Sequence, residues 1–119
     1  MGKFCVIVTN AKNDTDRATV GFVIANAAVG SDQQTLVFLS NEGVRLAVEG
    51  YADDMHEEGF APLKDLITNY VEGGGTILVC SPCFKKRGLD DTALVKGATI
   101  AGGAKLVEFL AGGTPSVSY

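Results

Sequence analysis

Two cysteines with two residues between them, Cys80 and Cys83, follow an apolar run at residues 76–79 and precede three cations at residues 85–87. A strand that stops at a cysteine brings its sulfur to the carboxyl edge of a sheet, where open α/β folds bind ligands. With Ser81 as N-cap and Pro82 as the first helical residue, both thiols would lie at a helix start, where free N–H groups favour an anion. Nearby cations also lower a thiol pKa, so the segment predicts a reactive thiolate.

Four interpretations of the cysteine pair are compatible with its sequence. A Cys-x-x-Cys at a helix start is typical of thioredoxin-like dithiols. A zinc site needs four ligands, and only Cys5, His56 and scattered carboxylates remain to complete one. Two buried thiols can also pack as small hydrophobic groups. The fourth interpretation is a nucleophilic cysteine that carries sulfur.

The composition sets limits on the protein class. A chain of 119 residues, with 46% hydrophobic and 20% charged residues, predicts one folded domain over residues 1–119. A net charge of −4, from 10 basic and 14 acidic residues, disfavours a nucleic-acid partner. No glycine-rich phosphate loop follows the first apolar run, so we expect no nucleotide cofactor, and no other cofactor or resident metal is predicted.

The cysteine count and the hydrophobic runs indicate a location. Three cysteines cannot form a complete set of disulfides, which favours a reducing compartment. The apolar run near the amino terminus is too short for a signal peptide, and no run approaches the roughly 18 apolar residues of a membrane span. We therefore expect a cytoplasmic protein without a membrane span.

Apolar runs and amphipathic patterns alternate along the chain. The predicted strands cover residues 4–9, 35–39, 76–79, 98–100 and a sheet-edge segment within 115–119. The first predicted helix runs from a cap at Asp14 or Thr15 to a left-handed stop at Gly30, and a short one covers residues 44–48. The next runs from Pro62 to the glycines at 73–75, and another covers residues 90–96. The last has an apolar face formed by Ala104, Val107 and Leu110. This alternation predicts a three-layer α/β sandwich, with a mostly parallel, flavodoxin-like sheet of about five strands and helices on both faces.

Polar residues after the first two strands are further candidates for the site. Asn10 follows the first strand, and Glu42 and Gly43 follow the second, at the same sheet edge as Cys80. We expect them to line a small pocket, although turn and capping roles explain them equally well. His56 lies in an acidic, exposed segment, and Cys5 is expected in the core.

Four segments, in order, resemble the DsrE/DsrF-like family. They are residues 4–9, 38–44, 79–88 and 100–104, so the similarity covers nearly the whole chain. The resemblance implies a small α/β protein, often oligomeric, in a family of which several members accept and pass on sulfur as a cysteine persulfide. The family cysteine lies eight residues before the glycine of an Arg-Gly pair, and that spacing from Gly88 selects Cys80. Cys83 occurs only in some branches.

The resemblance implies an intracellular sulfur carrier or sulfurtransferase-like protein. Cys80 would attack a donor persulfide and carry its sulfur, and Cys83 could resolve the persulfide as an internal disulfide. Lys85, Lys86 and Arg87 would stabilise the anions. The expected partners are sulfur donor and acceptor proteins or small thiols, and other copies of the chain in a homo-oligomer. The alternatives are a dithiol oxidoreductase that uses both cysteines, and a small-ligand or protein-interaction module in which the cysteines are incidental.

Overall fold

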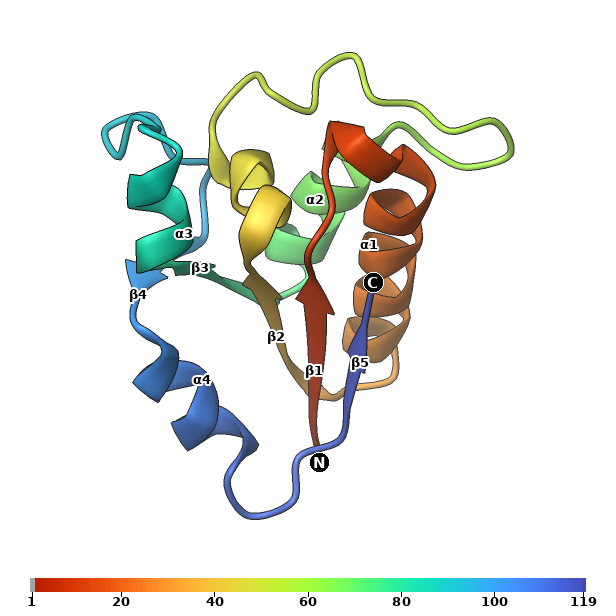
Figure 1. Cartoon of the computed structure of the whole chain (residues 1–119). Coiled ribbons are helices and arrows are strands. Elements are labelled where there is room, and N and C mark those ends of the chain that lie inside the picture. The colour runs from red at the N-terminus through yellow and green to blue at the C-terminus, as the bar shows by residue number, and fades with distance from the viewer. Residues whose placement is uncertain (1) are drawn as a thin grey trace.

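The computed structural model describes residues 2–119 and contains a five-stranded, all-parallel sheet. Its strands are β1 (Lys3–Val8), β2 (Gln34–Leu39), β3 (Thr76–Cys80), β4 (Ala98–Ala101) and β5 (Ser116–Ser118), shown in Figure 1. The predicted α/β architecture is confirmed. The strand order is β4-β3-β2-β1-β5, which differs from the 2-1-3-4-5 order of flavodoxin itself.

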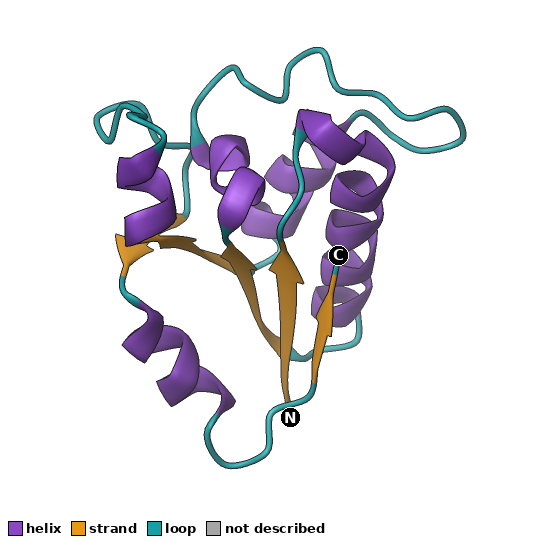
Figure 2. Ribbon diagram, viewed as in Figure 1, coloured by secondary structure: helices purple, strands orange, loops and turns teal. Residues whose placement is uncertain are grey.

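Helices connect each strand to the next (Figure 2). They are the 3₁₀ helix η1 (Lys12–Asp14), α1 (Thr15–Gly30), the 3₁₀ helix η2 (Asn41–Ala47), α2 (Leu63–Glu72), α3 (Ser81–Lys86) and α4 (Gly103–Leu110). The side chain of Asp14 caps α1 by accepting a hydrogen bond from the Arg17 N–H, as its position before the apolar stripe predicts.

The main core lies between α1, α2 and one face of the sheet. That face consists of alternate strand residues, which are Val6, Val8, Val37, Leu39, Ile77 and Val79. Phe22 of α1 meets Tyr70 of α2 edge to face, with ring centroids 5.8 Å apart. The Tyr70 hydroxyl donates to the Thr76 carbonyl at 2.7 Å, so this buried polar group is satisfied.

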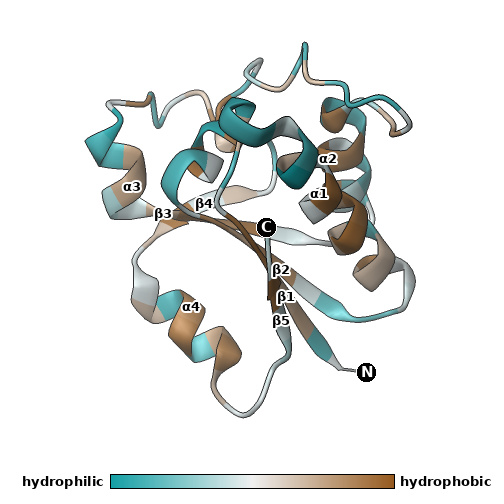
Figure 3. Cartoon of the chain, turned by 45° about the vertical axis from the view of Figure 1, so that its right-hand side comes forward, coloured by the Kyte–Doolittle hydropathy of each residue, from teal (hydrophilic) through white to brown (hydrophobic). Residues whose placement is uncertain are grey.

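The second face of the sheet is covered less closely. Leu36, Phe38 and Leu78 point to this side, and α4 crosses over it between β4 and β5. A hollow of about 350 Å³ separates α4 from the sheet, and no residue of α4 is buried. In Figure 3, α4 contains several hydrophobic residues and lies on the other side of the sheet from α1 and α2.

The structure corrects three local predictions. Gly30 ends α1 without a left-handed conformation, which is found instead at Asp32 (φ 60°). Cys80, not Ser81, is the N-cap of α3. Residues 90–96 form no helix, because the Asp90 carboxylate accepts hydrogen bonds from the Thr92 N–H and hydroxyl in a turn.

Candidate functional site

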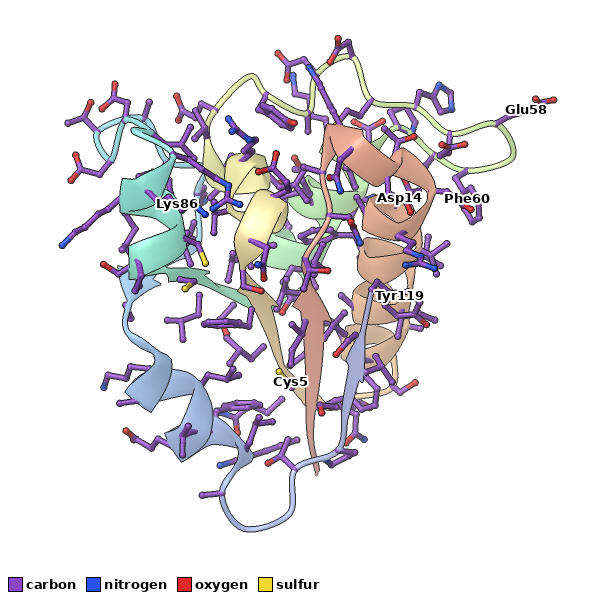
Figure 4. All side chains as sticks on the ribbon, in the orientation of Figure 1. Cys5, Asp14, Glu58, Phe60, Lys86 and Tyr119 are labelled. Atoms are coloured by element: carbon purple, nitrogen blue, oxygen red, sulfur yellow. The ribbon has the colours of Figure 1, made fainter. Side chains whose placement is uncertain are left out.

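The chain reversal from β3 into α3 holds both candidate thiols. Cys80 is the last residue of β3, and Cys83 lies in the first turn of α3. Both thiols are free and partly exposed, whereas Cys5 is completely buried within β1. The structure therefore brings Cys80 and Cys83 together at the carboxyl edge of the sheet, as the sequence predicts. In Figure 4, Lys86 of this edge and Cys5 lie in different parts of the molecule.

The two thiols interact with each other, and their pKa values shift in opposite directions. Burial raises the pKa of Cys80 more than the Cys83 backbone N–H lowers it, and the interaction with the Cys83 side chain raises it further. Burial also opposes ionisation of Cys83, but the Asn41 backbone N–H and the Cys80 S–H outweigh it and lower the pKa of Cys83. The charges of Arg87 and Lys86 act in the same direction. The shifts therefore favour the anion at Cys83 and the proton at Cys80, whereas the sequence led us to expect the thiolate at Cys80.

A carboxylate between two arginines lies beside the thiols. Glu42 accepts from the Arg45 Nε at 2.9 Å through Oε1 and from the Arg87 Nε at 2.7 Å through Oε2. Both arginines lower the pKa of Glu42, and Arg87 has the larger effect. Arg87 also donates to the Cys83 carbonyl at 3.1 Å, and its side chain is only 15% exposed. Arg87 thus links η2 to α3.

The start of η2 has a conformation that few residues adopt. Asn41 has a φ of 52°, in the left-handed region where asparagine is enriched among non-glycine residues. Gly43 packs against the end of β1, and a Cβ atom there would lie 2.1 Å from the Val8 carbonyl oxygen. The Ser40 N–H donates to the same oxygen at 3.1 Å. These contacts fix the segment that brings Asn41 and Glu42 to α3.

Other predicted residues lie outside this group. Lys85 is exposed, and it is not among the charges that shift the cysteine pKa values. Asn10 bonds to Asn13 and Thr9, and the hollow that it lines includes neither Cys80 nor Cys83. Gly43 belongs to the site only through the backbone that it allows to pack.

His56 does not approach the thiols. Its Nε2 interacts with the Phe60 carbonyl at 2.7 Å in the exposed loop before α2. Figure 4 places Phe60 on the opposite side of the molecule from Lys86. His56 is therefore not available as a proton donor or acceptor at the cysteine pair.

Sequence reasoning missed two residues of the site. Asn41 contributes only a backbone N–H, and Arg45 reaches Glu42 from one helical turn away. The signal for Asn41 was its residue type after a buried strand, because asparagine tolerates a positive φ. The signal for Arg45 was its spacing of three residues from Glu42 on a helical segment.

Two further observations concern residues 2–119 as a whole. Within this range, no group of three or more His, Cys, Asp and Glu side chains is arranged to hold a metal ion, and no helix is long and apolar enough to cross a membrane. A separate cavity of about 340 Å³ lies between the end of η2, α2 and residues 95–96, and neither cysteine of the pair lines it.

The different environments of the three thiols predict an order of reactivity. Because the pKa of Cys83 is lowered, its alkylation by iodoacetamide should begin at a lower pH than that of Cys80. Cys5, which burial shields and whose pKa burial raises to about 11, should react only after unfolding in urea. Peptide mass spectrometry of samples quenched at successive pH values measures this order. Modification of Cys80 before Cys83 would contradict the assignment.

Comparison with known proteins gives consistent matches. The model of the DsrE/DsrF-like family matches residues 2–114. The uncharacterised protein MJ0989 of Methanocaldococcus jannaschii is 31% identical over 108 residues, which is 91% of each chain. A second protein of that organism, the uncharacterised protein MJ0760, is 28% identical over 88% of this chain, which spans only 38% of that protein.

Solved structures share the fold. The ychN protein from E. coli superposes with a TM-score of 0.84 over the full length of both chains at 16% identity. MTH1491 from Methanobacterium thermoautotrophicum, a protein of unknown function, gives a TM-score of 0.74 at 13% identity, again over both full chains. At these identities, the structural matches support the architecture alone.

Proposed function

Since this chain belongs to the DsrE/DsrF-like family, we propose that it is a sulfur-relay protein that passes persulfide sulfur through Cys83 and Cys80. The observation that carries the proposal is that two free, partly exposed thiols lie at the end of β3 and the start of α3, with the Arg87 guanidinium bonded to the Cys83 carbonyl. The pKa shifts favour the anion at Cys83 and the proton at Cys80. A thiolate beside a thiol supplies both a nucleophile and a proton donor.

The loading step uses the Cys83 thiolate as nucleophile. It attacks the outer sulfur of a donor persulfide, R–S–SH, so that a Cys83 S–S bond forms and the donor S–S bond breaks. The products are Cys83–S–SH and the donor thiolate, R–S⁻, which takes the proton of Cys80. No net oxidation or reduction occurs, because one persulfide replaces another.

Transfer within the pair then uses the Cys80 thiolate that loading leaves behind. Cys80 attacks the outer sulfur of Cys83–S–SH, which forms Cys80–S–SH and regenerates the Cys83 thiolate. An acceptor thiolate, A–S⁻, then attacks the outer sulfur of Cys80–S–SH, so that A–S–SH forms and the Cys80 S–S bond breaks. The Cys80 thiolate takes a proton from solvent, which restores the starting thiol. This order keeps Cys80 as the sulfur-carrying residue, as the resemblance implies, and assigns the first attack to its neighbour. The relay needs reduced thiols, which a cytoplasmic location supplies.

The test is mass spectrometry after exposure to glutathione persulfide. We expect the intact protein to gain the mass of one sulfur atom, tandem spectra to locate it on Cys80, and a small thiol acceptor to remove it. The double variant Cys80→Ser/Cys83→Ser, which keeps Cys5, is the control and should gain no mass. A wild-type protein that gains no sulfur while both thiols stay open to alkylation would overturn the proposal.

A dithiol oxidoreductase is the second candidate, because two free thiols with two residues between them lie at the end of β3 and the start of α3. In that case, redox buffers would interconvert the dithiol and a Cys80–Cys83 disulfide, and the protein would reduce a disulfide substrate. Persulfide transfer without such turnover separates the two functions.

We also propose that the protein is a homo-oligomer that associates through α4. Val107 is 67% exposed, and Leu106 and Leu110 are only partly buried. Lys105 and Glu108 line the hollow between α4 and the sheet, so Leu106, Val107 and Leu110 are left on the other sides of the helix. A second copy could cover these apolar residues with the same residues of its own α4. The apolar outer face of α4 therefore favours another copy as the occupant.

This surface gives a direct prediction. Val107→Lys should place a charge in the interface, and should lower the sedimentation coefficient to that of a monomer at micromolar concentration. The exposed position makes the change compatible with folding. Thr68→Lys, on an exposed position of α2, is the matched control and should leave the assembly unchanged. Identical sedimentation of both variants and the wild type would exclude α4 as the contact.

A further inference from the structure

We propose that Glu42 is a positioning residue for the loading step: its carboxylate holds the Arg87 guanidinium against α3, beside Cys83. The inference rests on the proposed function for the reaction, and on the contacts around Arg87 for the role of Glu42. It extends the site to a residue that need not touch the sulfur.

The side chain of Arg87 turns back along α3, and this conformation needs a second contact to hold it. It follows the last residue of α3, yet its Nη1 reaches back one turn to the Cys83 carbonyl at 3.1 Å. An arginine side chain loses much rotamer entropy when it is held in this way. The charge-assisted bond from Nε to Glu42 at 2.7 Å offsets that cost. Without Glu42, only one neutral carbonyl contact would hold the guanidinium among the contacts described.

Glu42 is suited to this role because it uses both carboxylate oxygens. Oε1 accepts from Arg45 and Oε2 from Arg87, so each guanidinium has its own acceptor. Arg45 and Glu42 are both on η2, whereas Arg87 comes from the segment after β3. The Arg45 contact therefore orients the carboxylate, and the Arg87 contact joins the two elements. A glutamine would offer one acceptor oxygen, and its amide would face a second donor.

The backbone beneath Glu42 is fixed independently. Gly43 packs on the Val8 carbonyl, and the Gly43 N–H donates to the Ser40 carbonyl at 2.8 Å. The backbone N–H of Asn41, the preceding residue, lowers the pKa of Cys83. One short segment thus reaches α3 at two points, the Cys83 sulfur and the Arg87 guanidinium. The charged groups that lower the pKa of Cys83 are Arg87 and Lys86, and the protonated Cys80 thiol acts in the same direction.

The experiment measures alkylation of Cys83 by iodoacetamide as a function of pH, in a Cys80→Ser background that keeps a hydroxyl donor. We expect Glu42→Gln to slow the reaction about threefold to tenfold at neutral pH and to move its pH profile upward, because Arg87 leaves the sulfur. Arg87→Gln should have a similar effect. Adding Glu42→Gln to Arg87→Gln should change little more, since both changes act through one contact.

Two variants serve as controls. Lys85→Gln removes an exposed cation from the same helix and should leave the profile nearly unchanged. Arg45→Gln removes the other partner of Glu42 but keeps Arg87, and should have a smaller effect than Glu42→Gln. If Glu42→Gln leaves alkylation unchanged or accelerates it, as loss of a nearby negative charge alone would do, the proposal is wrong. Additive effects of Glu42→Gln and Arg87→Gln would overturn it as well. Alkylation needs no persulfide, so this result is independent of whether sulfur transfer occurs.

Discussion

Replacing Cys83 with serine is expected to slow sulfur uptake from glutathione persulfide roughly tenfold to a hundredfold. The variant loses the thiol whose pKa is lowered and retains Cys80, whose pKa is raised mainly by burial. At neutral pH, a smaller fraction of the remaining thiol is ionised, and the thiol form is a poor nucleophile. The initial rate of mass gain, followed by intact-protein mass spectrometry, measures the effect.

Cys80→Ser is the matched variant and separates loading from transfer. Its serine hydroxyl can still donate a hydrogen bond to the Cys83 thiolate, so uptake should continue at a rate within a few-fold of the wild type. The sulfur should then stay on Cys83, and release to an acceptor thiol should become slower. The opposite pattern, with uptake lost in Cys80→Ser and kept in Cys83→Ser, would assign both attack and carriage to Cys80.

Much of the fold follows from patterns that are strictly local. Continuous apolar runs predict β1, β2 and β3 to within one residue at each end, because strands buried on both faces carry little polar interruption. The predicted helix at residues 90–96 does not form, because contacts with a distant segment take precedence there over the local pattern. There, a turn at Asp90 and the antiparallel bridge between Val48 and Leu94 replace the helical hydrogen bonds. Contacts between distant segments of this kind leave no periodic signal in the sequence.

The site shows the same division between local and distant information. The cysteine pair and Arg87 are visible as a motif, since strand, turn and cations are adjacent in the chain. Which thiol keeps the proton is not visible, because the deciding N–H of Asn41 comes from another connection. Asn10 was selected by the same sheet-edge argument as Glu42, but its side chain bonds to Asn13 and Thr9. A sheet edge thus identifies a region, and the loops decide which residues meet there.

The difference in pKa between Cys80 and Cys83 depends on how closely η2 packs against β1. The contact is made at Gly43, which is buried and directly follows Glu42. Gly43 lies against Val8 at the end of β1, and Asn41, two residues earlier, interacts with Cys83. Movement of Gly43 would therefore shift the start of η2 away from α3. A single methyl group at this position therefore tests both stability and thiol chemistry.

Gly43→Ala is expected to lower the free energy of unfolding by about 2–4 kcal/mol. The added Cβ would lie 2.1 Å from the Val8 carbonyl oxygen, a backbone atom that cannot rotate away. Relief requires η2 to move off β1, and this displaces Asn41 and Glu42 from Cys83 and Arg87. Urea denaturation measures the stability, and alkylation of Cys83 in the folded variant should also slow. Gly30→Ala, where a Cβ meets nothing within 4 Å, is the control and should be neutral or slightly stabilising. Equal stability of the two variants would show that η2 can move without cost. Our inference that contact with β1 holds the backbone around Glu42 in place would then be wrong.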